Sequence, residues 1–125
     1  MPVVGVGGYF FRAKDPEALK AWYREHLGVG GGCGTDANGE SNPYLWHQQA
    51  GPTVFEPFKE SSDYFPADRT AMVNLRVTDL KGMVDRLRTS GIEITQEQTH
   101  EGVGSFARIH DPEGNPIELW EPPAD

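Results

Sequence analysis

The chain has 125 residues, the size of one domain with one hydrophobic core. Apolar residues make up 37% and charged residues 24%, a globular rather than a disordered composition. The net charge of −8 argues against nucleic acid and anionic membrane surfaces as partners, because both attract basic proteins. No stretch approaches the roughly 20 apolar residues that span a bilayer.

The N-terminal stretch has no basic segment, and glycines interrupt its apolar run, so we expect no signal peptide. The single cysteine, Cys33, cannot form a disulfide within the chain. No histidine or other base is close to it in sequence, so we expect a spectator thiol. Together these features predict a cytoplasmic protein.

The first predicted elements are a strand and a helix. Aromatic residues without helix breakers predict a strand over residues 9–13. Asp15 is a predicted N-cap, Pro16 suits the first helical position, and Gly28 ends the helix. The stripe between them has helical spacing and consists of Leu19, Trp22, Tyr23 and Leu27.

Glycine-rich residues 28–43 follow the helix and predict a long loop, which serves either as a lid or as a simple connection. No phosphate-binding motif can be drawn through them. Strands are predicted around residues 44–47 and 53–57, and residues 59–68 link the two halves of the chain.

The second half repeats this pattern. Residues 72–77 predict a strand, Asp79 an N-cap, and Gly91 a helix end. Asp15 and Asp79 are 64 residues apart, half the chain length. The stripe of the second helix consists of Leu80, Met83, Val84 and Leu87.

The ends of the halves also match, because residues 53–57 (TVFEP) resemble residues 118–122 (ELWEP). An internal repeat fixes the architecture. We therefore predict one α+β domain over residues 1–125, built from two βαβββ repeats at about 4–58 and 70–122. Their curled mixed sheets surround a central cup, and a helix backs each sheet. Residues 111–115 predict a turn before the last strand.

Three segments carry a resemblance to a known family: DPEALKAWYREHLG (15–28), VTDLKGMVDRLRTSGI (77–92) and DPEGNPIELWEP (111–122). In this order they resemble the vicinal oxygen chelate superfamily, also called the glyoxalase/bleomycin resistance/dioxygenase family. The family includes lyases, isomerases, dioxygenases, thiol transferases and non-catalytic drug binders, so the resemblance implies the fold and leaves the reaction open.

Enzymes of that family hold a divalent metal in the cup with His, Gln or Glu ligands at equivalent points of both halves. The four matching positions here are Gly8, Thr53, Met72 and Glu118. Glu118 alone is a suitable ligand, and one carboxylate cannot hold a catalytic ion that usually needs three protein ligands. We therefore expect no metal and no other cofactor.

The four histidines have no partner at the i+2 or i+4 position. Each is expected to be structural or solvated rather than a metal ligand, although two of them still merit a test. The histidines are His26, His47, His100 and His110, and the two to test are His47 and His110.

Strand alternation indicates which side chains face the cup. Val73, Leu75 and Val77 are expected on the helix side, as are Ile117 and Leu119. The predicted ligand-binding residues inside the cup are Phe10, Arg12, Trp46, Phe55, Met72, Asn74, Arg76, Glu118 and Trp120.

This set is mostly apolar with a few polar groups, as in pockets for organic molecules. Alternatively, the side chains plug the cup, with Arg76 and Glu118 paired to each other. We favour a pocket, because Asn74, Arg76 and Glu118 would be costly to bury in a dry core.

Four functions follow, in decreasing order of preference. The first is a binding protein that sequesters a bulky, partly aromatic molecule, as the antibiotic-resistance members of the family do, and the resemblance implies a homodimer. The second is a metal-independent lyase or isomerase with Glu118 as catalytic acid or base and Arg76 steadying an oxyanion. The third is a plugged fold for protein contacts, and the last is a metal-dependent lyase or dioxygenase.

Overall fold

The computed structural model describes residues 2–30 and 44–124 of the chain. The elements, in chain order, are α1 (Pro16–Leu27), β1 (Val73–Arg76), α2 (Leu80–Thr89), β2 (Gln96–His100), β3 (Gly104–His110) and β4 (Pro116–Glu121). Cys33 and most of the glycine-rich segment 28–43 lie outside the described residues. Among the described residues, no helix is long and apolar enough to cross a membrane.

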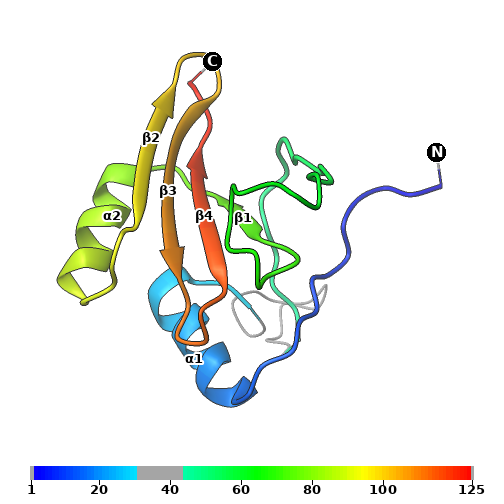
Figure 1. The fold of residues 1–125 in the computed structure, drawn as a ribbon, viewed down its shortest axis with the longest axis vertical. Coiled ribbons are helices and arrows are strands. Elements are labelled where there is room, and N and C mark those ends of the chain that lie inside the picture. The colour runs from blue at the N-terminus through cyan, green and yellow to red at the C-terminus, as the bar shows by residue number, and fades with distance from the viewer. Residues whose placement is uncertain (1, 31–43, 125) are drawn as a thin grey trace.

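One open mixed sheet of four strands, in the order β1-β4-β3-β2, forms the centre of the fold. Strand β4 pairs in parallel with β1 and antiparallel with β3, which pairs antiparallel with β2. Figure 1 shows α2 beside this sheet and α1 below the turn that joins β3 to β4. The predicted α+β class is thus confirmed, and the second predicted repeat is present as β1-α2-β2-β3-β4.

The hydrophobic core lies between the sheet and the helices. Alternate residues of β3 and β4 point to this side and meet the apolar stripe of α2. Three partly buried residues of α1 (Trp22, Tyr23 and Leu27) and three around β1 (Val73, Leu75 and Val77) pack against the same cluster. The cluster itself consists of Leu80, Val84, Leu87, Ala107, Ile109, Ile117 and Leu119.

The caps that begin both helices agree with the sequence pattern. The side chains of Asp15 and Asp79 accept hydrogen bonds from the backbone N–H groups of Ala18 and Gly82, at 3.2 and 3.1 Å. Gly28 ends α1 with φ at 66°, a left-handed conformation that strains residues with a Cβ atom.

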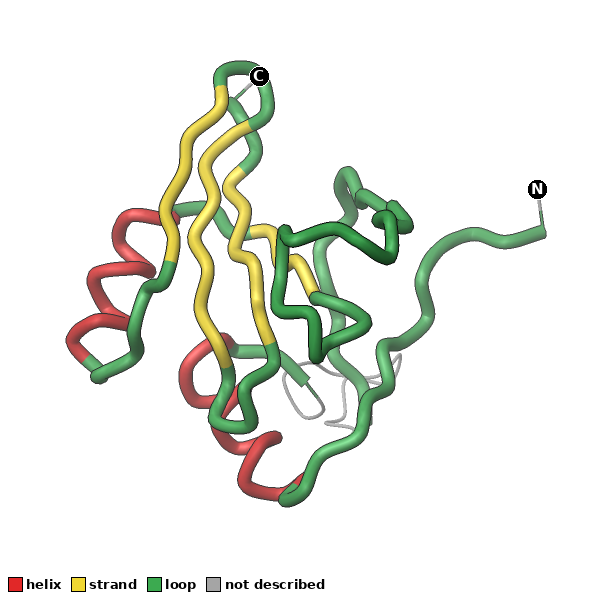
Figure 2. The backbone as a smooth tube through the Cα atoms, viewed as in Figure 1, coloured by secondary structure: helices red, strands yellow, loops and turns green. Residues whose placement is uncertain are grey.

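The first half differs from the predicted repeat. Its helix is present, but residues 2–15 and 44–72 form no strand, as the loops in Figure 2 show. Strand-like sequence forms a strand only when a second strand satisfies its backbone hydrogen bonds, and among the residues that the structure describes these segments have no such neighbour. Helix α1 therefore packs on the core of the second half and backs no sheet of its own.

The turn between β3 and β4 joins the two halves. The side-chain carboxylate of Glu113 accepts hydrogen bonds from the backbone N–H groups of Lys14 and Asp15, at 2.7 and 3.0 Å. Its backbone carbonyl accepts from Arg69, at 2.8 Å. The segment before α1 and the segment before β1 are thus both attached to this turn.

Candidate functional site

A row of polar side chains crosses the sheet on the face opposite α2. The backbone register aligns Asn74 of β1 with Glu118 of β4, Glu118 with Arg108 of β3, and Arg108 with Gln96 of β2. The residues on either side of Glu118 and Arg108 point into the core, so strand alternation directs these two away from it.

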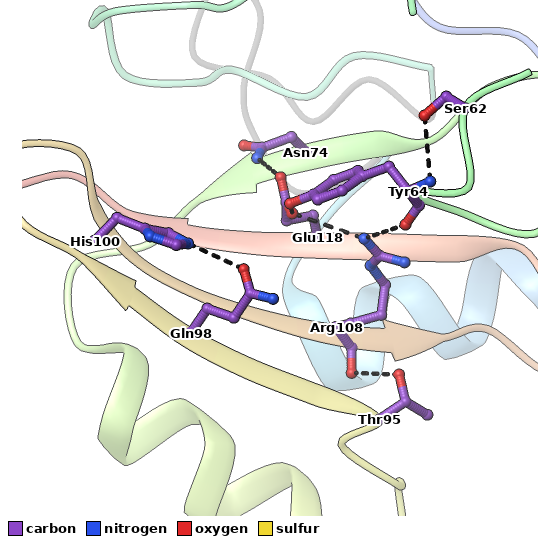
Figure 3. Close-up of polar contacts among 8 residues, drawn as sticks. All are labelled: Ser62, Tyr64, Asn74, Thr95, Gln98, His100, Arg108 and Glu118. Carbon is purple, nitrogen blue, oxygen red and sulfur yellow. Dashed lines mark hydrogen bonds and ion pairs between the residues drawn. The ribbon is translucent and has the colours of Figure 1, made fainter. Parts of the chain in front are cut away.

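Glu118 is the centre of this row and is only 7% exposed. One carboxylate oxygen accepts a hydrogen bond from the side-chain amide of Asn74, at 2.8 Å. The other accepts from the hydroxyl of Tyr64 and lies 3.8 Å from a guanidinium nitrogen of Arg108. Figure 3 shows these three partners converging on the carboxylate from β1, β3 and the segment before β1. A buried carboxylate needs such partners, and here it has them.

Arg108 is 6% exposed and contacts Tyr64 twice. Its Nη2 donates to the Tyr64 carbonyl at 3.2 Å, and its guanidinium carbon lies 5.1 Å from the centre of the Tyr64 ring. This is a cation–π geometry. The buried Nε of Arg108 has no hydrogen-bond partner among the residues that the structure describes.

The environment of Tyr64 favours its neutral form. Burial raises the pKa of the phenol above its usual value, and the hydrogen bond to Glu118 raises it further. Tyr64 therefore remains a hydrogen-bond donor to the carboxylate throughout the physiological pH range.

An aromatic surface lies next to the polar row. Trp120 and Phe106 are register partners on β4 and β3, with ring centroids 6.2 Å apart and planes within 5° of parallel. The Trp120 indole donates to the Val103 carbonyl at 2.9 Å, which fixes the ring, and the centroid of the His100 ring lies 6.1 Å from that of Phe106. This face therefore combines buried polar groups with flat aromatic groups.

The predicted site residues of the second half take different places. Asn74 and Glu118 meet directly, and Trp120 lies two register positions further along β4, on the same face. Arg76 does not pair with Glu118, because its guanidinium donates to the Gln49 carbonyl at 2.9 Å, and Arg108 pairs with Glu118 instead. Met72 is partly buried just before β1.

The predicted site residues of the first half lie apart from this row. Phe10 and Phe55 are 92% and 88% exposed, and Arg12 and Trp46 are also exposed. In the single chain these residues lie in segments without a strand, so no sheet directs them toward the cup. Their part in ligand binding stays a prediction.

Three residues of the site were missed by sequence reasoning: Arg108, Tyr64, and Phe106, which shares the face of Arg108 two residues earlier on β3. Arg108 could have been found, because the apolar residues Ala107 and Ile109 flank it and the alternation of β3 then sends it to the face of Glu118. Tyr64 lies in the predicted linker 59–68, and no local pattern indicates that its side chain reaches the sheet.

The donor set does not fit the divalent metal of the family's enzymes. Both oxygens of Glu118 already accept hydrogen bonds, and the guanidinium of Arg108 would repel a cation beside them. Gly8, Thr53 and Met72 offer no strong ligand. Within residues 2–30 and 44–124, no three His, Cys, Asp or Glu side chains gather closely enough to hold an ion.

Comparison with known proteins agrees with the fold. The family model of the Glyoxalase/Bleomycin resistance protein/Dioxygenase superfamily matches residues 5–119. No curated protein matches the chain in sequence.

Three solved structures illustrate the likeness. TnmS3, an antibiotic binding protein from Streptomyces sp. CB03234, is 20% identical, with a TM-score of 0.61 and coverage of 98% of this chain and 99% of its own. Lactoylglutathione lyase from Agrobacterium tumefaciens is 18% identical, with a TM-score of 0.61 and coverage of 97% and 96%. A glyoxylase/bleomycin resistance protein/dioxygenase domain from Frankia sp. EAN1pec is 20% identical, with a TM-score of 0.56 and coverage of 97% and 99%. Because the family model spans most of its length, the chain belongs to the Glyoxalase/Bleomycin resistance protein/Dioxygenase superfamily.

Proposed function

We propose that the protein binds and sequesters a bulky, partly aromatic small molecule, such as an antibiotic natural product, without chemical change. The observation that carries the proposal is the face on which the stacked pair Phe106 and Trp120 adjoins the polar row of Glu118 and Arg108. Binding sites for organic molecules combine apolar surface with a few placed polar groups. Superfamily membership and the antibiotic binding protein TnmS3 among the similar structures support this class.

The aromatic pair gives the proposal its test. We expect Trp120→Ala to weaken the binding of a flat polycyclic natural product about 10- to 100-fold, since an aromatic contact of this size is worth roughly 1.5–3 kcal/mol. Isothermal titration calorimetry of wild type, Trp120→Ala and Val103→Ala measures this. Val103 is an exposed neighbour whose carbonyl holds the indole, so its variant keeps the stacking surface and is the matched control.

Three outcomes contradict sequestration. If no member of a broad panel of aromatic natural products binds the wild type, the proposed ligand class is wrong. If Trp120→Ala binds with unchanged affinity, the binding site does not include this face. Recovery of a converted product after incubation identifies an enzyme and favours the metal-independent lyase or isomerase, in which Glu118→Gln would abolish turnover.

We also propose that the protein is a homodimer. The described residues expose thirteen large hydrophobic side chains, of which Val103 alone lies in the second half. Large exposed apolar patches commonly mark protein interfaces, and these side chains supply the apolar area that such an interface needs. A second copy that covers the first-half segments would also bring Phe10 and Phe55 into apolar surroundings.

Sedimentation velocity tests the dimer. We expect the wild type to sediment at twice the chain mass of 13.8 kDa, and the double variant Phe10→Ser/Phe55→Ser to shift toward the monomer. The control, Val103→Ser, removes an exposed side chain at the turn between β2 and β3 and should leave the dimer intact. A wild type that stays monomeric at micromolar concentrations contradicts the proposal.

A further inference from the structure

Tyr64 occupies the polar row from outside the sheet. It belongs to the segment between the halves, yet its phenol contacts two residues on adjacent strands. Its hydroxyl donates to Glu118, and its ring lies beside the guanidinium of Arg108. A carboxylate acceptor and a cation next to the ring are the partners that any phenol would find at this place.

The segment that carries Tyr64 is held by loop contacts and by the hydrogen bond from Arg108 to the Tyr64 carbonyl, and not by strand pairing. No helix or strand includes residues 58–68. The Tyr64 backbone N–H donates to the Ser62 hydroxyl at 3.2 Å, and the Phe58 ring packs against the Tyr64 ring with centroids 5.5 Å apart. Displacement of Tyr64 therefore breaks its contacts with the row without disrupting the sheet.

Tyr64 lines the hollow over the polar row but leaves one buried donor there without a partner among the described residues. The hollow between Tyr64, Phe106, Arg108 and Glu118 has no room for a water molecule. The Arg108 Nε nevertheless stays buried without a partner among the described residues, although a buried donor normally finds an acceptor. An incoming oxygen could therefore gain a hydrogen bond that Tyr64 does not make.

We infer that Tyr64 is a built-in substitute for the ligand, and that the ligand is a phenol whose hydroxyl replaces that of Tyr64 at Glu118 and whose ring takes its place beside Arg108. This inference rests on the proposed function and names its ligand class. The adjoining rings of Phe106 and Trp120 extend the apolar surface available to a fused-ring phenol.

Competition with Tyr64 sets the expected result. A ligand binds only the open state, in which Tyr64 has left the polar row. The rarer this state is, the higher the apparent dissociation constant of the ligand, so removal of Tyr64 strengthens binding. We expect Tyr64→Ala to bind 2-naphthol at least about 10-fold more tightly than the wild type. The matched probe 2-methoxynaphthalene has the same rings but no donor hydroxyl and should show no such gain.

Two further variants complete the experiment. Tyr64→Ala/Glu118→Gln should lose most of the gain for 2-naphthol, because a neutral amide oxygen accepts a hydrogen bond less strongly than a carboxylate. Tyr64→Phe keeps the ring beside Arg108 and removes the hydroxyl, so it should show a smaller gain even if Tyr64→Ala folds poorly. Circular dichroism checks the fold, and calorimetry gives each affinity.

The outcomes separate this inference from the proposed function. Equal gains for 2-naphthol and 2-methoxynaphthalene overturn the phenol but leave an aromatic site. Weaker binding in both Tyr64→Ala and Tyr64→Phe makes Tyr64 part of the site wall and overturns its role as a substitute. If natural products bind the wild type while neither probe binds any folded variant, the inference fails and the proposed function stands. If no compound binds any variant, both fail.

Discussion

Replacement of Arg108 by alanine is expected to lower the free energy of unfolding by about 3–5 kcal/mol, the range for breaking a buried ion pair. The carboxylate of Glu118 would keep its bonds from Asn74 and Tyr64 but lose the cation beside it. Tyr64 would also lose a partner for its ring and for its carbonyl. Urea unfolding of both proteins, with the slopes of the transitions compared, measures the difference.

A surface pair provides the control. The ion pair of Arg88 and Glu97 is shorter, at 2.6 Å, but about half of each side chain is exposed to solvent. Because water screens such a pair, Arg88→Ala should cost at most about 1 kcal/mol. Similar losses for Arg88→Ala and Arg108→Ala would contradict the buried character of the Glu118 site.

The double variant Arg108→Met/Glu118→Leu separates two reasons for the loss. Replacing a buried charge pair by apolar residues of similar size is often neutral for stability, while removing one partner is not. We expect the double variant to recover most of the stability lost in Arg108→Ala. Stability without the charges would then indicate that the pair is retained for binding rather than for folding.

The contrast between the two halves shows how far the sequence predicts the fold. In the second half, strand alternation puts Asn74 and Glu118 on one face and Ile117 and Leu119 on the other, and the structure agrees. Strand β4 is paired on both sides, so local pattern and long-range pairing favour the same state. In the first half, residues 9–13 and 53–57 have a similar local pattern but no paired neighbour, and the described chain leaves them without a strand.

The sequence predicts only part of the candidate site, and the reason is related. Alternation identifies which residues of a strand share a face, and Arg108 obeys it as well as Glu118 does. Alternation does not identify which cation on that face reaches the carboxylate, and Arg76, the cation proposed from the sequence, turns to Gln49 instead. Tyr64 comes from a segment without periodicity, so only the tertiary structure reveals it.

Asp111→Ala is expected to lower the free energy of unfolding by about 2–4 kcal/mol, since it leaves several partly buried donors unsatisfied. Asp111 is 4% exposed. Its carboxylate accepts from the hydroxyl of Tyr23 at 2.8 Å, from the backbone N–H of Glu113 at 2.9 Å, and from the backbone and side chain of Asn115 at 3.0 and 2.8 Å. The motif DPEGNP predicts a turn by composition. In the structure its first residue, Asp111, also attaches α1 to this turn through Tyr23.

The matched control for this prediction is Tyr23→Phe. It removes only the hydroxyl, whose pKa is raised by burial and then by the hydrogen bond to Asp111, and should cost about 1 kcal/mol. Hydrogen exchange should show α1 losing more protection than α2 in Asp111→Ala, because the Tyr23 bond attaches α1 to this turn.

If Tyr23→Phe costs as much as Asp111→Ala, the attachment of α1 explains the whole effect and the bonds within the turn contribute little. Asp111 and Glu118 belong to one sequence motif but have different roles. The residues at its start hold the two halves together, while the carboxylate inside β4 belongs to the binding face. Asp111→Ala should therefore leave the affinity of the folded protein for an aromatic ligand unchanged, and a loss of affinity with α1 still protected would place the turn within the binding site.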